Sequence, residues 1–174
     1  MSKIILKNVR LSFPSLFKKA EFNGEQTKYE ATFLISKKDQ ADVIAKIEKM
    51  IDAAAVDKWK KKPNSLKTCL VDGDSKDYDG YEGMMSIKAA SNRRPTVLDR
   101  DKSPLVEEDG KPYAGCYVNA SLELWVQDNS YGKRINCNLN GVQFFKDGES
   151  FGAGDNDSSG DFDEFDDDDD SLFD

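Results

Sequence analysis

The most acidic stretch in the first 154 residues is a loop whose carboxylates could bind metal ions. It runs from Asp72 to Gly80 and contains Asp72, Asp74, Asp77 and Asp79. Carboxylates that hold two divalent ions can support phosphodiester cleavage, so a metal-dependent nuclease is one interpretation. The loop fails the calcium-loop pattern, because Lys76 occupies the third ligand position and Asp77 stands where Gly is required. Its carboxylates also crowd a single loop instead of converging from separate elements, so we keep the nuclease only as an alternative.

The chain contains few residues that could bind other metals or form disulfides. The chain has no His and three Cys, namely Cys69, Cys116 and Cys137, with no Cys-x-x-Cys pair. An odd number of widely spaced cysteines without His favours neither structural zinc nor a disulfide framework. We therefore expect no metal and no cofactor, and we assign no catalytic residue.

Cations stand near aromatic residues in a combination that suits nucleic acid. Residues 91–102 form an extended, Pro-restricted stretch rich in cations, and two more cations follow Tyr131. Cations can follow phosphates while exposed rings stack on bases, each stack contributing about 1 to 3 kcal/mol. The candidates for phosphate contact are Arg93, Arg94, Arg100, Lys102, Lys133 and Arg134, and those for base stacking are Tyr113, Tyr117, Trp125 and Tyr131.

Each of these assignments has a structural alternative. The cations of residues 91–102 could pair with Asp99 and Asp101, and loops could cover the rings of Tyr117 and Trp125. The sequence leaves both alternatives open. Weaker candidates of the same kind are Phe17, Lys18 and Lys19.

The charge of the chain divides into two parts. There are 25 Lys and Arg against 33 Asp and Glu. Eleven of the acids lie in residues 155–174, which contain no cation, so residues 1–154 carry 25 cations against 22 acids, about +3. A basic body joined to a polyanion indicates that the body binds another polyanion, namely nucleic acid.

Residues 155–174 have too few apolar side chains to offset the entropy of ordering, so we expect a disordered acidic tail. Its apolar residues are Phe162, Phe165, Leu172 and Phe173. A tail that only increased solubility would not need the apolar pair Leu172 and Phe173 near its tip, so we predict that the apolar residues dock on a partner. The Gly-rich residues 148–154 are interpreted as a flexible linker, and residues 1–147 as the folded domain.

Hydrophobic periodicity predicts strands and one long helix before the linker. Strands are expected at residues 4–13, 28–36, 84–90, 113–126 and 133–145, and the helix at 39–61, capped by Asp39 or Ser36. A shift of parity at Asn140-Gly141 predicts a β-bulge in the last strand.

Alternation also assigns strand faces. In residues 4–13 it places Ile5, Val9, Leu11 and Phe13 on one face, with Leu6, Asn8, Arg10 and Ser12 on the other. In residues 113–126 every even position is apolar and should line a core, so Tyr117 and Trp125 share the opposite face with polar side chains.

Five strands, one long helix and a bulged closing hairpin favour a mainly β fold, an OB-fold-like and partly open five-stranded barrel. The helix falls between the second and third strands, whereas the plainest OB-fold has it between the third and fourth. No stretch approaches the roughly 20 apolar residues of a membrane span, and the N-terminus does not have the pattern of a signal peptide. We therefore expect a cytoplasmic protein.

Several stretches together form a recognisable pattern that spans nearly all of residues 1–147. They are Asn8 to Pro14 with Leu16-Phe17, Lys28 to Ile35, Arg94-Pro95 through Asp99-Arg100-Asp101, Tyr113 to Ala120, and Leu139 to Gln143. This pattern resembles a family of bacteriophage single-stranded DNA-binding proteins. The resemblance implies an OB-fold and a non-enzymatic protein that coats single strands during phage DNA replication and recombination.

The acidic tail resembles those of bacterial single-stranded DNA-binding proteins and podovirus replication proteins, which end in acids and a terminal aromatic. Here Phe173 is followed by Asp174. We expect the tail to compete with DNA and to recruit a phage DNA polymerase, helicase or recombinase in the host cytoplasm. In a third interpretation the tail makes the chain a DNA mimic or a chaperone for basic proteins.

Overall fold

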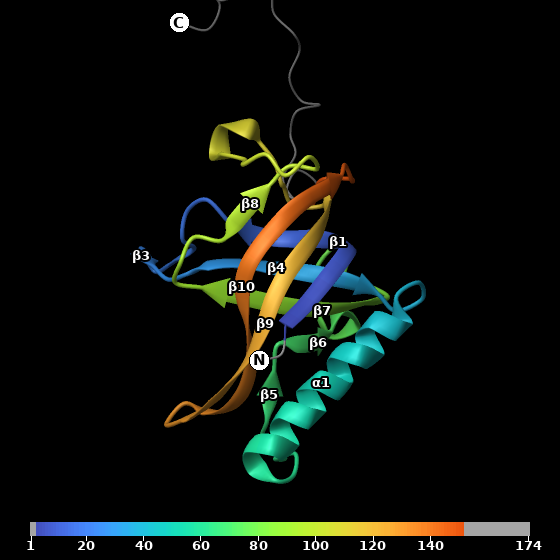
Figure 1. Cartoon of the computed structure of the whole chain (residues 1–174), viewed down its shortest axis with the longest axis vertical. Coiled ribbons are helices and arrows are strands. Elements are labelled where there is room, and N and C mark those ends of the chain that lie inside the picture. Colours follow the sequence, from blue (N-terminus) through green and yellow to red (C-terminus); the bar gives the residue numbers. More distant parts are fainter. Residues whose placement is uncertain (1–2, 152–174) are drawn as a thin grey trace, which may run out of the picture.

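Five long strands close into a β-barrel in the computed structural model, which describes residues 3–151 (Figure 1). They are β1 (Lys3–Ser15), β4 (Tyr29–Ser36), β7 (Met84–Ser91), β9 (Tyr117–Asn129) and β10 (Gly132–Lys146). Strand β1 pairs with β4 and β9, β4 with β7, and β9 with β10, all antiparallel. A parallel contact between Asn138 of β10 and Ala90 of β7 closes the circle. The predicted mainly β, OB-fold-like architecture is confirmed, and the barrel is closed instead of partly open.

Several short strands and two 3₁₀ helices lie in the connections between the barrel strands. The hairpin of β2 (Glu21–Phe22) and β3 (Glu25–Gln26) lies in the connection between β1 and β4. Strands β5 (Lys67–Thr68) and β8 (Thr96–Leu98) pair in parallel with β10, and β6 (Leu70–Asp72) pairs with β7. The 3₁₀ helices η1 (Gly73–Ser75) and η2 (Glu107–Asp109) lie in loops. We did not predict β8, because a three-residue strand beside a proline has no periodicity to recognise.

The predicted faces of the first half of β1 are wrong, because a β-bulge interrupts the alternation. Leu6 pairs with Ala120 and Val9 with Val118, so three steps along β1 oppose two along β9. Asn8 takes up the extra residue with φ 54°, and its N–H is satisfied by the side-chain oxygen of Asn119. Leu6 is therefore fully buried, and Ile5 is exposed.

A second irregularity in β1 reverses Ser12 and Phe13. Pro14 has no N–H to donate, and the register shifts between Ser12 and Ser15. Phe13 has φ 47° and 55% of its surface is exposed, whereas Ser12 is buried and accepts a hydrogen bond from the Tyr81 hydroxyl. Phe13, which we predicted on the same face as Val9 and Leu11, therefore faces solvent, whereas those two side chains are buried.

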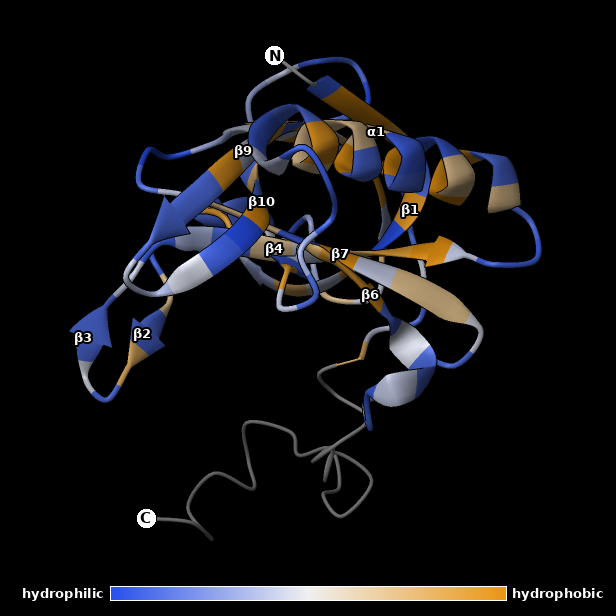
Figure 2. Cartoon of the chain, turned by 90° about the horizontal axis from the view of Figure 1, so that it is seen from below, coloured by the Kyte–Doolittle hydropathy of each residue, from blue (hydrophilic) through white to orange (hydrophobic). Residues whose placement is uncertain are grey.

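Helix α1 (Ala41–Trp59) lies across one end of the barrel (Figures 1 and 2), where it contacts β4, β9 and β10. The helix is predicted correctly from its periodicity, and its buried apolar residues are Ile44, Ile47, Ile51 and Ala55. The predicted caps are wrong: the N-cap is Gln40, which makes no side-chain capping bond. The Ser36 hydroxyl instead accepts the Asp39 N–H just ahead of the helix. At the other end Lys60 adopts a left-handed conformation.

Strand β9 begins at Tyr117, later than predicted. Gly115 has φ 107° and donates its N–H to the Leu11 carbonyl, so the chain turns there before the strand starts. A side chain at this position would collide with the Glu149 carbonyl, so only glycine fits. Beyond the turn, the predicted core face of β9 is correct from Cys116 to Leu124. The predicted bulge in β10 is also present, since the register shifts between Leu139 and Gly141.

The first part of the predicted linker lies along the barrel. Phe151 donates its N–H to the Ala114 carbonyl, and its ring lies 4.0 Å from the Arg10 guanidinium. The Arg10 side chain also donates to the carbonyls of Gly115 and Glu149. The predicted docking residues of the tail lie outside the described residues. Within residues 3–151, no helix is long and apolar enough to cross a membrane.

Candidate nucleic-acid interface

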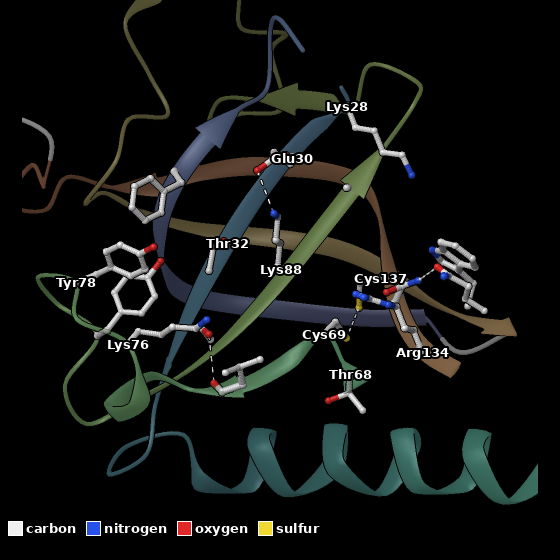
Figure 3. Close-up of a pocket in the computed structure, with 18 of the residues that line it drawn as sticks. Lys28, Glu30, Thr32, Thr68, Cys69, Lys76, Tyr78, Lys88, Arg134 and Cys137 are labelled. Atoms are coloured by element: carbon white, nitrogen blue, oxygen red, sulfur yellow. Dashed lines mark hydrogen bonds and ion pairs between the residues drawn. The ribbon is translucent and has the colours of Figure 1, made fainter. Parts of the chain in front are cut away.

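A groove of about 850 Å³ runs over the outer face of β4, β7 and the β9–β10 hairpin (Figure 3). We call it the barrel groove. Its charged lining residues are four cations and one carboxylate: Lys28, Lys76, Lys88, Arg134 and Glu30. Its aromatic lining residues are Phe13, Tyr78, Tyr81, Trp125 and Tyr131. The groove is thus basic and carries rings, which is the combination that single-stranded nucleic acid requires.

One set of rings comes from β1 and the loop before β7. The rings of Phe13 and Tyr78 meet edge to face with centroids 5.1 Å apart, and Tyr78 lies 5.2 Å from Tyr81. Tyr81 is buried and donates its hydroxyl to Ser12 at 2.8 Å, and burial raises the pKa of that hydroxyl. Tyr81 is therefore held in place by the fold and supports the ring set from below. The other two rings, those of Phe13 and Tyr78, are each more than half exposed.

The other set of rings comes from the β9–β10 hairpin. Trp125 pairs with Asn136 across the two strands, and Tyr131 lies in the turn with 83% of its surface exposed. Arg134 follows on β10. The Asn136 amide donates to Gln127 at 3.0 Å, which links the two strands beside the rings. The hairpin thus presents two rings and a cation to the same groove.

An ion pair lies on the floor of the groove between β4 and β7 (Figure 3). The Lys88 ammonium is 3.4 Å from the Glu30 carboxylate, and the Lys88 side chain remains 61% exposed. An exposed pair of this kind contributes little to stability. The Lys88 ammonium therefore stays available to a phosphate that approaches from solvent.

The predicted cation cluster of residues 91–102 is split by the structure. Ser91 pairs with Tyr29, next to Lys28, so the loop that carries Arg93 and Arg94 starts at one end of the barrel groove. Both side chains are exposed, and the Arg94 guanidinium lies 5.6 Å from the Phe17 ring. Lys133 is exposed near the hairpin, 6.0 Å from the Trp59 ring.

Seven of the ten predicted residues do not line the groove. Besides Arg93, Arg94 and Lys133, they are four residues on the side where β10 ends. The Arg100 guanidinium lies 5.6 Å from the Phe145 ring, and Lys102 occupies a left-handed turn position. Tyr113 donates its hydroxyl to Asp147 at 2.7 Å, a bond to a carboxylate that raises the pKa of the phenol. Tyr117 is half-buried under Lys146 and Arg10. We call Arg100, Lys102, Tyr113 and Tyr117 the second surface.

Asp99 and Asp101 do not pair with the predicted cations within the described residues. Lys111 contacts Asp99 at 3.1 Å, and the N–H and hydroxyl of Ser103 donate to Asp101. A hydrogen bond from the Arg100 N–H, together with the Lys111 contact, holds the pKa of the Asp99 carboxyl below the usual value, and the hydrogen bonds from Ser103 do the same for Asp101. Among the weaker candidates, Lys18 lies 3.5 Å from Glu107.

The acidic loop has structural partners. The Lys37 ammonium lies 2.6 Å from a carboxylate oxygen of both Asp72 and Asp74. Asp72 also accepts the Asp74 N–H at the start of η1, and Asp74 accepts the Gly83 N–H. In residues 3–151 no cluster of three or more His, Cys, Asp or Glu is arranged to hold a metal ion. The geometry thus favours a structural role for these two carboxylates over the nuclease interpretation.

Sequence reasoning missed six of the nine cationic and aromatic lining residues: Phe13, Lys28, Lys76, Tyr78, Tyr81 and Lys88. Lys88 is exposed on β7, in a stretch where the side chains alternate. Parity alone cannot tell which outward face is concave. Lys76 and Tyr78 were hidden in an acidic stretch that we interpreted as a solvated loop.

Comparison with known proteins identifies the family. Residues 2–172 match the family described as Enterobacter phage Enc34, ssDNA-binding protein. Protein p50 of Acyrthosiphon pisum secondary endosymbiont phage 1 is 45% identical over 163 residues, which is 87% of this chain and 88% of that protein.

Two solved structures of the single-stranded DNA-binding protein from bacteriophage Enc34 are similar to the barrel. One, in complex with ssDNA, has 32% identity and a TM-score of 0.77, and the match covers 86% of this chain and 89% of that one. The other has 34% identity and a TM-score of 0.78, with 92% and 90% covered. Both structures are of a protein described as single-stranded DNA-binding, in agreement with the family that the sequence resembles. The chain therefore belongs to the Enc34 family of bacteriophage ssDNA-binding proteins.

Proposed function

We propose that this protein binds single-stranded DNA in the barrel groove without catalysing a reaction. The observation that carries the proposal is a groove with four cations and five aromatic residues, in a chain of a phage ssDNA-binding family. In OB-folds the face of the second and third strands binds oligonucleotides, together with the loops after the first and fourth strands. Here β4 and β7 are those strands, and Tyr131 lies in the turn between β9 and β10.

Binding in this groove combines charge with stacking. Lys28, Lys88 and Arg134 contact phosphates, while Trp125 and Tyr131 stack on bases at one set of rings and Phe13 and Tyr78 at the other. Arg93 and Arg94 extend the basic path beyond Lys28. Because every base has a π-face, we expect little preference for sequence.

The acidic tail gives the proposal a second part. Residues 155–174 carry eleven carboxylates and no cation, so a tethered tail competes with DNA for the groove cations. Its apolar residues recruit a replication partner such as a phage DNA polymerase, helicase or recombinase. In this account the protein coats and protects single strands during phage DNA replication and recombination.

A titration of a fluorescent oligonucleotide tests the proposal. We expect affinity for a single strand that falls steeply between 50 and 300 mM salt, because roughly 0.7 counterions are released per phosphate contact. A flat dependence on salt would show that phosphate contacts do not drive binding. If the protein fails to bind single strands even without residues 155–174, the DNA-mimic or chaperone interpretation is favoured instead. Cleavage of the oligonucleotide in the presence of magnesium or manganese would instead support the nuclease interpretation.

A further inference from the structure

Two cysteines that are 68 positions apart in the sequence meet at the barrel groove. The Sγ atoms of Cys69 and Cys137 are 3.3 Å apart (Figure 3). Cys69 lies between β5 and β6, where its N–H donates to the Ile135 carbonyl and its carbonyl accepts the Lys88 N–H. Backbone bonds to both β10 and β7 therefore hold Cys69 beside Cys137. Spacing along the sequence gave no sign of this pair.

The two thiols differ in access. Both line the groove, but Cys69 is half-buried, whereas only 3% of Cys137 is exposed. Cys69 is therefore the more accessible of the two residues to a small reagent that enters the groove. The third cysteine, Cys116, is fully buried, and burial raises its pKa to about 11.

Their protonation also differs. The hydrogen bond between the two sulfurs lowers the pKa of Cys69 and raises the pKa of Cys137. The thiolate is the reactive form of cysteine, so Cys69 is the nucleophile of the pair. Cys137 keeps its proton until Cys69 has reacted.

We propose that Cys69 and Cys137 form an oxidation site, which hydrogen peroxide converts into a reversible disulfide within the barrel groove. The Cys69 thiolate attacks one peroxide oxygen, the O–O bond breaks, and the other oxygen leaves as water after taking a proton. The Cys69 sulfenic acid that results is then attacked by the Cys137 sulfur. The S–S bond forms as the S–O bond breaks, and a second water leaves. Two thiols and one peroxide thus give one disulfide and two waters.

The product would change the groove. A disulfide has an S–S distance of about 2.05 Å, so the sulfurs must approach by more than about 1 Å from their present separation. The bond would tie the β5–β6 connection covalently to β10. The inference does not depend on DNA binding, because the thiol chemistry is measured on the protein alone.

Treatment of the full-length protein with hydrogen peroxide tests the inference. We expect the intact mass to fall by about 2 Da and the free thiols to fall from three to one, both reversed by dithiothreitol. A peptide map without reduction should contain Cys69 linked to Cys137. The Cys116→Ser variant should behave like the wild type, and Cys69→Ser and Cys137→Ser should not form the bond.

Two outcomes would overturn the inference. One is a wild-type protein that gains oxygen at Cys69 but keeps the Cys137 thiol. The other is a disulfide that includes Cys116 or joins two molecules. If Cys116→Ser fails to fold, the peptide map of the wild type alone decides between these results.

Discussion

Among single residues, we expect the exposed rings of the barrel groove that pack on no other ring within residues 3–151 to be the most specific to DNA binding. Tyr131 is 83% exposed and Trp125 is 38% exposed, and neither belongs to the core. The hairpin gains nothing from presenting large rings to water, whereas a stacked base would cover them. Tyr81 is the contrasting case, because its hydroxyl and ring are both used within the fold.

Replacing these rings should weaken DNA binding without changing the fold. We expect Trp125→Ala and Tyr131→Ala each to cost about 1 to 3 kcal/mol of binding free energy, with the salt dependence nearly unchanged. Tyr117→Ala is the control from the second surface and should retain wild-type affinity. The measurement is fluorescence anisotropy with a labelled oligonucleotide. If Trp125→Ala unfolds the protein, its ring belongs to the core and its assignment is wrong.

Replacing cations should change the salt dependence instead. We expect Lys28→Ala with Lys88→Ala to reduce the slope of log affinity against log salt by about 0.7 for each lost phosphate contact. The control is Lys46→Ala with Lys49→Ala, which removes the same charge from the exposed face of α1. Equal slopes for the two double variants would mean that net charge, and not the groove, determines affinity.

At the scale of elements, the loop from β6 to β7 depends on one lysine. Lys37 comes just after β4 and contacts Asp72 and Asp74, so it ties β4 to η1. The hydrogen bonds from Lys37 hold the pKa of both carboxyls below the ordinary 3.8 and raise the pKa of the lysine. All three groups are open to solvent, so the contribution to stability is small.

Because of these contacts, we expect the stability of the fold to decrease as the pH falls. Carboxyls whose pKa is lowered by folding stabilise the fold above 3.8, and the stabilisation is lost as the pH falls through their lowered values. We expect the urea midpoint of the wild type to fall more between pH 5 and pH 2 than that of Lys37→Met. Lys62→Met, which removes only a contact with Asp52, should follow the wild type. If the urea midpoints of the wild type and Lys37→Met change identically with pH, the Lys37 contacts with Asp72 and Asp74 do not contribute to stability.

The sequence predicted long periodic elements better than irregular ones. The helix and the core face of β9 follow from apolar side chains at regular spacing, as in Ile44, Ile47 and Ile51. The faces of β1 could not be predicted in the same way, because the bulges at Asn8 and Phe13 each change the alternation of side chains. These bulges depend on how β1 pairs with β9 and β4. Phe13 became a groove residue through such a bulge, so part of the site was hidden by the same cause.

The site was only partly predictable for a further reason. Trp125, Tyr131 and Arg134 could be identified, because ring and charge stand close together in one hairpin. Lys28 and Lys88 come from two strands that are distant in sequence and meet only when β4 pairs with β7. Arg100 and Tyr117 looked equivalent to the groove residues, but the closure of the barrel places them on the second surface.

At the scale of the whole molecule, the acidic tail and the basic groove belong to one chain. We expect deletion of residues 155–174 to tighten single-strand binding, most strongly at low salt, because a tethered polyanion no longer occupies the cations. Removal of Leu172, Phe173 and Asp174 alone leaves ten of the eleven acids. DNA affinity should then hardly change, while binding to a replication polymerase should be lost with the aromatic anchor.

Titrations of these two truncated proteins at low salt separate the two roles of the tail. Equal DNA affinity for the full-length protein and the protein without residues 155–174 would rule out competition. Binding to the polymerase that persists without the last three residues would rule out docking through the tip.

The central claim is that the single strand lies in the barrel groove, and photochemical cross-linking tests it most directly. An oligonucleotide with 5-iodouracil joins its bases to aromatic side chains in stacking contact, and mass spectrometry of the peptides identifies the residues. The account predicts cross-links to Trp125, Tyr131, Phe13 or Tyr78, which line the groove. Cross-links confined to Tyr113, Tyr117 and Phe145 would place the strand on the other side of the barrel and contradict it.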